Sequence, residues 1–291
     1  MPYALLITAT VFLSLSGICA TFYNRKNAGK KDTAAIYNLI QLVAVFLFWL
    51  VKFLTNPEMD PAVLPYSILF TLGYTAAMAA SVSAYREGSL VLSSLIMQLS
   101  MITTSIWGFF FWNSPVTPMV VIGLLLVVVA LWLCLYQGKE EKGVKKKITP
   151  KWIFYISIFF VGNSLASITQ RTQQLNFESA YGDFLMAVAT GIGVVACAIL
   201  YLRSDKTDSK AIVKSTWYIP AISGATNFVI NLIVITLATT ALSPTLVYPF
   251  MAVGSLAITT VVSIFTFKEK MKWWQWIGVS IGAVSIVLLS I

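Results

Sequence analysis

The chain has 291 residues, of which 58% are hydrophobic and only 11% are charged, and its mean hydropathy is +0.83. A soluble domain has about a quarter charged residues, so this composition excludes a soluble globular protein and predicts a fold solvated by lipid. The net charge of +9 does not indicate a nucleic-acid partner. The basic residues lie in short stretches between long apolar runs, where polytopic membrane proteins carry their topology signal.

Ten apolar stretches are long enough to cross a membrane as helices. The hydrocarbon core of a bilayer, ~30 Å thick, requires about 20 apolar residues in a helix. The predicted spans are 3–22, 34–54, 62–85, 89–112, 117–136, 152–172, 183–202, 217–240, 244–267 and 273–290. The first has no basic region before it, so we interpret it as a retained span rather than a cleaved signal. Alternation of period 2 is absent, so we predict an all-α integral membrane protein.

The longest polar stretch, residues 138–151, lies between the fifth and sixth spans and divides the chain into two halves. A shift of 155 residues lays 62–136 on 217–291 without a gap and aligns Pro65 with Pro220. Five spans per half is an odd number, so the halves must have opposite orientations, as in the inverted repeats of secondary transporters. We therefore predict a first five-helix repeat over 1–137, a basic cytoplasmic linker over 138–151 and a second five-helix repeat over 152–291.

The basic residues predict which ends of the spans face the cytoplasm. Eighteen of the 20 Lys and Arg residues lie in the loops after the odd-numbered spans, and only Lys52 and Arg171 lie at the ends of even-numbered spans. By the positive-inside rule the loops after odd spans are cytoplasmic. Both termini are then external to a multi-pass protein of the cell membrane.

The last two predicted spans carry a loose family motif. The matching features are the proline that opens the ninth span, small residues within it, an acid after it and two glycines in the tenth: Pro244, Gly254, Ser255, Glu269, Gly278 and Gly282. This pattern and the ten-span layout resemble the EamA-like transporters of the drug/metabolite transporter superfamily. Two features depart from that family, because Ser114 stands where the first half would have the loop acid, and the family commonly has cytoplasmic termini. The resemblance implies a cavity lined by spans 1–4 and 6–9, with spans 5 and 10 outside.

Ionisable groups are almost absent from the middle of the spans, and this limits the chemistry. Asp183, the first residue of the seventh predicted span, is predicted to be an N-cap, with a site or coupling role as the alternative. Glu269 lies among lysines and tryptophans at the lipid boundary, so we interpret its segment as an interfacial anchor. The chain has no histidine, and its cysteines lie in apolar runs. We therefore predict no metal, no cofactor, no catalytic residue and no enzymatic activity.

Neutral polar and aromatic side chains within the spans are the better candidates for a binding site. In the third span, Tyr74, Met78, Ser81 and Tyr85 form a stripe at helical spacing. Interhelical hydrogen bonding is one explanation for such groups, and a polar central cavity is the other. Pro249 is expected to break the ninth span and to free backbone carbonyls beside Tyr248. The predicted substrate-binding residues are Tyr37, Asn38, Gln41, Tyr74, Tyr85, Gln98, Trp107, Asn163, Asp183, Asn227, Asn231 and Tyr248.

These residues favour a secondary transporter that moves a small polar organic solute, such as an amino acid or a related metabolite, by alternating access. An organic cation held by tyrosines and Trp107 is the first alternative, and a non-transporting membrane scaffold is the second. The expected partners are a small-molecule solute and the lipid bilayer, and the chain is either a monomer or a homodimer.

Overall fold

The computed structural model describes residues 2–87, 90–114, 116–135, 149–240, 242–267 and 273–290. The described chain is helical and contains no strand. The helices are α1 (Pro2–Lys26), α2 (Thr33–Thr55), η1 (Pro61–Val63), α3 (Leu64–Glu87), α4 (Leu90–Phe111), α5 (Pro118–Leu135), α6 (Pro150–Asn176), α7 (Gly182–Leu202), α8 (Ser209–Thr216), α9 (Tyr218–Ala238), α10 (Pro244–Phe267) and α11 (Trp273–Ser290).

Within this described part, seven helices are long and apolar enough to cross a membrane: α1, α2, α3, α6, α7, α9 and α10. The helices α4, α5 and α11 contain shorter apolar stretches, which are Leu99–Phe111, Pro118–Ala130 and Trp276–Ser285. Large apolar side chains such as Phe110 and Phe265 are exposed on the outside of the bundle, where lipid would cover them. The chain therefore has the architecture of a multi-pass, all-α membrane protein.

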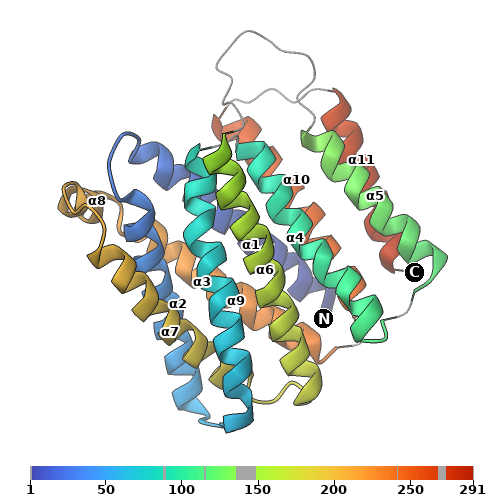
Figure 1. Cartoon of the computed structure of the whole chain (residues 1–291). Coiled ribbons are helices and arrows are strands. Elements are labelled where there is room, and N and C mark those ends of the chain that lie inside the picture. The colour runs from blue at the N-terminus through green and yellow to red at the C-terminus, as the bar shows by residue number, and fades with distance from the viewer. Residues whose placement is uncertain are drawn as a thin grey trace.

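The helices pack in a few dominant pairs. Helix α3 packs along α6, α1 along α9, α2 along α7, and α5 along α11. Figure 1 shows α5 and α11 side by side at one edge of the bundle. Helices α3 and α6 approach closely where two glycines, which have no side chain, face each other. A Cβ on Gly73 would lie 2.5 Å from the carbonyl oxygen of Gly162, and a Cβ on Gly162 would lie 2.6 Å from that of Gly73. Small residues at such crossings let membrane helices approach closely.

Three local expectations from the sequence are wrong. Pro249 does not break α10, which is helical from Pro244 to Phe267, because neighbouring helices can compensate for one lost backbone hydrogen bond. Asp183 is not an N-cap. The cap position of α7 is Tyr181, and Asp183 lies in the first turn, where it forms an ion pair with Lys52 of α2. The segment between the predicted spans 183–202 and 217–240 was expected to connect them as a loop, but its residues 209–216 form the short helix α8, with Ile212 buried.

The chain runs up and down the bundle, so its loops alternate between two ends. The end that carries residues 27–32 and 203–217 holds most of the described basic residues and is called the basic end below. The other end carries residues 56–63 and 177–181 and is called the opposite end. Figure 1 shows α8 at the basic end, beside the loops that leave α1 and α7.

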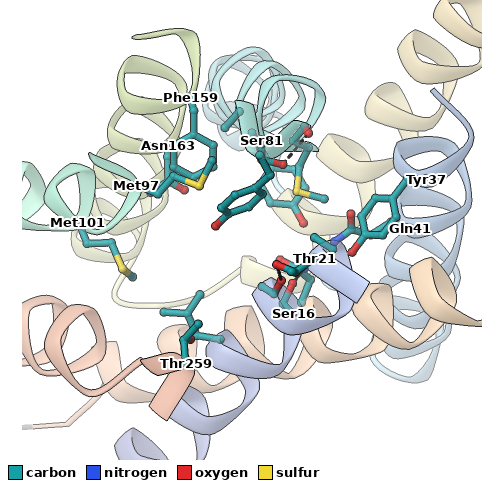
Figure 2. A pocket seen from close by; sticks show the side chains of 18 of the residues that line it. Ser16, Thr21, Tyr37, Gln41, Ser81, Met97, Met101, Phe159, Asn163 and Thr259 are labelled. Atoms are coloured by element: carbon teal, nitrogen blue, oxygen red, sulfur yellow. Dashed lines mark hydrogen bonds between the residues drawn. The ribbon is translucent and has the colours of Figure 1, made fainter. Parts of the chain in front are cut away.

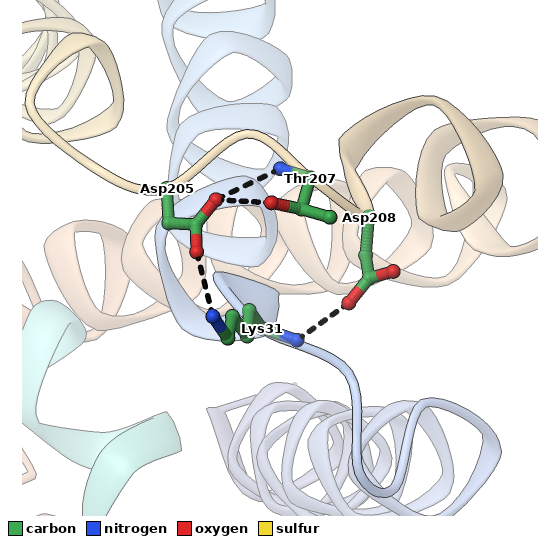
Figure 3. A network of polar contacts seen from close by, with 4 residues as sticks. All are labelled: Lys31, Asp205, Thr207 and Asp208. Carbon is green, nitrogen blue, oxygen red and sulfur yellow. Dashed lines mark hydrogen bonds and ion pairs between the residues drawn. The ribbon is translucent and has the colours of Figure 1, made fainter.

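A polar network ties two loops together at the basic end (Figure 3). The Lys31 ammonium lies 3.0 Å from a carboxylate oxygen of Asp205, and the Lys31 backbone N–H donates to Asp208 at 2.9 Å. The Thr207 backbone N–H and hydroxyl both donate to Asp205. Hydrogen bonds from Thr207, followed by that from Lys31, lower the pKa of Asp205 to about 2. The carboxylate is therefore ionised at neutral pH and holds the α1–α2 loop to the α7–α8 loop.

Candidate functional site

A cavity of about 160 Å³ lies in the middle of the helix bundle. Side chains of α1, α2, α3, α4, α6, α9 and α10 line it, whereas α5, α7 and α11 contribute none of the lining residues described. A buried water needs roughly 10–15 Å³ of such space, so the cavity holds on the order of ten waters or one small solute. The family resemblance implied that spans 1–4 and 6–9 line the cavity and that spans 5 and 10 lie outside. The positions of α5 and α11 agree with this expectation, whereas α7, the seventh span, departs from it because it packs behind α2 and α3.

The lining combines polar, aromatic and aliphatic side chains and is uncharged in the part of the chain that the structure describes (Figure 2). It includes three amides, three tyrosines and three methionines: Gln41, Asn163, Asn227, Tyr37, Tyr74, Tyr85, Met78, Met97 and Met101. Amides and hydroxyls can both donate and accept hydrogen bonds, whereas the rings and thioethers give soft apolar contact. This surface suits a small molecule that has both polar groups and an apolar group.

A hydrogen-bond network fixes the amides on one wall of the cavity. The Gln41 side-chain amide donates to the Ser223 hydroxyl at 3.0 Å, and that hydroxyl lies 3.0 Å from the hydroxyl of Ser16. The Asn227 amide donates to Ser16 at 3.0 Å, so α1, α2 and α9 are joined. Such a network orients the amides before a ligand arrives. On the other wall, the Asn163 amide donates to the Ser100 hydroxyl at 2.8 Å.

Two tyrosines of the lining have unmet hydrogen bonds. Tyr37 is 1% exposed and Tyr74 is 8% exposed, and neither buried hydroxyl has a hydrogen-bond partner within the described structure. A buried polar group without a partner is unfavourable, so a movement that exposes either hydroxyl to the cavity would give it a partner in a ligand.

Among the described residues, the cavity adjoins a second hollow at the basic end and is closed at the opposite end. Thr21 and Tyr85 line both the cavity and a second hollow of about 320 Å³, whose wall also contains Arg25 and Arg86. At the opposite end the space beside Arg171 is only about 10 Å³, which is room for one water at most. In the part of the chain that the structure describes, the bundle is therefore open on one side of the predicted membrane and shut on the other.

The structure brings six of the twelve predicted binding residues together around the cavity: Tyr37, Gln41, Tyr74, Tyr85, Asn163 and Asn227. The whole stripe on α3, from Tyr74 through Met78 and Ser81 to Tyr85, lines it. The stripe was recognisable because its steps of three and four residues keep one helical face.

The other six predicted residues lie elsewhere. Asn38 is buried outside the lining, and Asn231 donates to the Asn227 carbonyl at 2.9 Å, deeper in α9. Trp107 is 37% exposed and stacks on Phe111, and Asp183 pairs with Lys52. Tyr248 lines the small void at the opposite end. The side chain of Gln98 is outside the described part of the structure.

Several lining residues were absent from the predicted site. On α1, Ser16, Gly17 and Thr21 face the cavity, and Phe159 and Thr259 do so on α6 and α10. Small hydroxyl residues and glycines are also common at helix contacts in membranes, so their type alone does not distinguish a cavity from a packed interface.

Comparison with known proteins shows the fold only. No protein-family model matches the chain, and no curated protein matches it. A solved structure entitled "Crystal structure of protein" is similar over 98% of this chain and 96% of its own, with a TM-score of 0.69 and 12% sequence identity. The helix arrangement is thus shared with another folded protein, and that title carries no activity.

Proposed function

We propose that the chain is a ten-span, EamA-like member of the drug/metabolite transporter superfamily that moves a small polar organic solute across the cell membrane by alternating access. The observation that carries the proposal is the uncharged cavity in mid-bundle, lined by both polar and apolar side chains, which among the described residues is open at the basic end and closed at the opposite end. A carrier needs a central site that is accessible from one side at a time.

The packing of the helices supports two inverted five-helix halves. The halves correspond in order: α1 with α6, α2 with α7, α3 with α9, α4 with α10 and α5 with α11. If each helix is replaced by its counterpart in the other half, the packed pair α3–α6 becomes α9–α1, the pair α4–α6 becomes α10–α1, and the pair α3–α7 becomes α9–α2. The pairs α2–α7, α4–α10 and α5–α11 map onto themselves. Each of these pairs is in contact, as expected for repeats related by a pseudo-two-fold axis with the site between them.

An amino acid or a related metabolite fits the cavity best. The lining has room for a molecule of that size and offers amides and hydroxyls to its polar groups without a net charge of its own. The rings of Tyr37, Tyr74, Tyr85 and Phe159 also favour an organic cation, which a cation–π site would hold. With the basic end in the cytoplasm, the described conformation is open to the inside.

Flux through purified protein in liposomes tests the proposal. Radiolabelled L-leucine, L-phenylalanine, L-glutamine and choline are the probes, and exchange against the same unlabelled solute is the readout. Asn227→Ala removes an amide from the lining and is expected to raise KM about two- to tenfold, the value of one hydrogen bond. Val121→Ala, on the exposed face of α5, is the matched control and should leave KM unchanged. Wild-type protein that moves none of these solutes would contradict the proposal.

A further inference from the structure

An arginine with unmet hydrogen bonds lies inside the closed end of the bundle. The sequence predicts Arg171 near the end of a span, but α6 extends to Asn176 and so places Arg171 more than one turn inside the helix. Its Nε atom is buried without a hydrogen-bond partner. Among the residues that the structure describes, no carboxylate lies within ion-pair distance of Arg171. Arg171 is half-buried, and its Nε is the guanidinium nitrogen that is buried without a partner. An arginine within a membrane helix and without a counter-ion is costly, and in membrane proteins it is a sign of function.

Two further polar groups share the small void with Arg171. Gln174, one turn further along α6, is 2% exposed, and neither its amide nitrogen nor its carbonyl oxygen has a partner in the described structure. Tyr248 of α10 lines the same void and is 4% exposed. Guanidinium, amide and phenol groups together provide several donors for one acceptor group, and the three residues that carry them line a space that holds one water at most.

The void lies on a polar track that leads from the cavity. On α6, Asn163 lines the cavity, and Gln170 and Gln174 follow at steps of seven and four residues on the same face. On α9, Asn227 lines the cavity and Asn231 follows one turn later. The Gln170 side-chain amide donates to the side-chain oxygen Oδ1 of Asn231 at 3.4 Å, which bridges the two helices between cavity and void.

We propose that Arg171, with Gln174 and Tyr248, forms a carboxylate-binding site that is filled when the opposite end opens, and that the solute therefore carries a carboxylate. The inference rests on the proposed transport function and selects its substrate class. A guanidinium binds a carboxylate through two parallel hydrogen bonds, whereas it repels a quaternary ammonium group. In the described conformation the site is too small for a carboxylate, so the solute meets it only from the opposite side. Separation of α6 from α9 at the Gln170–Asn231 bridge would enlarge the site and join it to the cavity.

Competition from each side of sided liposomes tests this site. The probe is whichever of L-leucine, L-phenylalanine and L-glutamine exchanges fastest in wild-type protein, together with its methyl ester, which lacks the negative charge. Arg171→Gln should weaken binding of the free acid from the opposite side tenfold or more, with little change for the ester. Binding of the acid from the basic end should change less than about twofold, because the central cavity is intact. Arg171→Lys keeps the charge but loses the planar pair of donors, so its effect should be intermediate.

The possible results separate the two proposals. Wild-type transport of the acid with the same acid-to-ester preference in Arg171→Gln would overturn the carboxylate site and leave the transporter intact. Transport of choline but of no amino acid would do the same. Absence of flux for acids, esters and choline would overturn the proposed function together with the site. A purely structural Arg171 would lower the thermal stability and alter binding equally from both sides, which would also contradict the inference.

Discussion

The crossing of α3 and α6 leaves no room for a side chain, so Gly73→Ala should destabilise the fold. A Cβ at position 73 would lie 2.5 Å from the Gly162 carbonyl oxygen and 2.9 Å from the Ala166 nitrogen. Both are backbone atoms of a helix, so a side-chain rotation cannot relieve the contact. An ordinary van der Waals separation is 3.4–4 Å, so the helices must move apart by about 1 Å. Overpacking of this kind costs roughly 1–3 kcal/mol, more than the gain of about 1 kcal/mol from replacing glycine in a helix.

Unfolding of purified protein in mixed micelles, with SDS as the denaturant and circular dichroism as the readout, measures this change. Gly17→Ala is the control, because a Cβ there would have no atom within 4 Å and the helix should become slightly more stable. Gly162→Ala should resemble Gly73→Ala, and the double variant should cost less than the sum, since one displacement of the helices relieves both contacts. Equal stability of Gly73→Ala and wild type would refute the close crossing.

Two further predictions concern charged groups at the two ends. Asp183→Asn removes the ion pair between Asp183 and Lys52. The Asp183 side chain is 24% exposed and the Lys52 side chain is 36% exposed. Because this pair is partly solvated, the free energy of unfolding should fall by no more than about 1 kcal/mol. Exchange of solute across the liposome membrane should persist. Loss of solute exchange would instead assign Asp183 a coupling role. The pKa of Asp205 is lowered to about 2, so its contacts persist at any pH above its usual value of 3.8 and are lost as the pH falls through about 2. Between pH 7 and 5 the backbone amides of residues 27–32 should therefore keep the same protection from hydrogen exchange, once the pH dependence of intrinsic exchange is subtracted. Asp205→Asn should speed the hydrogen exchange of these amides at pH 7. A variant with wild-type protection would refute the role of this carboxylate.

The sequence alone determined the class of the protein and the approximate position of its long helices. Lipid offers no hydrogen bonds to a backbone, so an apolar run of sufficient length is driven into a helix whatever its neighbours. Thus the predicted span 183–202 and the helix Gly182–Leu202 differ by one residue. The same reasoning fails where helices continue into polar sequence. The last turn of α6 is formed by residues whose amides, such as Gln173 and Gln174, are buried by other helices, and composition does not reveal that burial.

Helical periodicity also determined which residues share a face, as on α3, but only the tertiary structure decided which face meets the cavity. Gln41 lines the cavity while Asn38, three residues away on α2, is buried outside the lining. The close contact of Gly224 with the Gln41 carbonyl sets the approach of α9 to α2. The sequence likewise could not assign a role to Arg171, because the effect of a charge depends on what surrounds it. Helix formation is local and follows from the solvent, whereas rotation and depth of each helix follow from contacts between residues far apart in the chain.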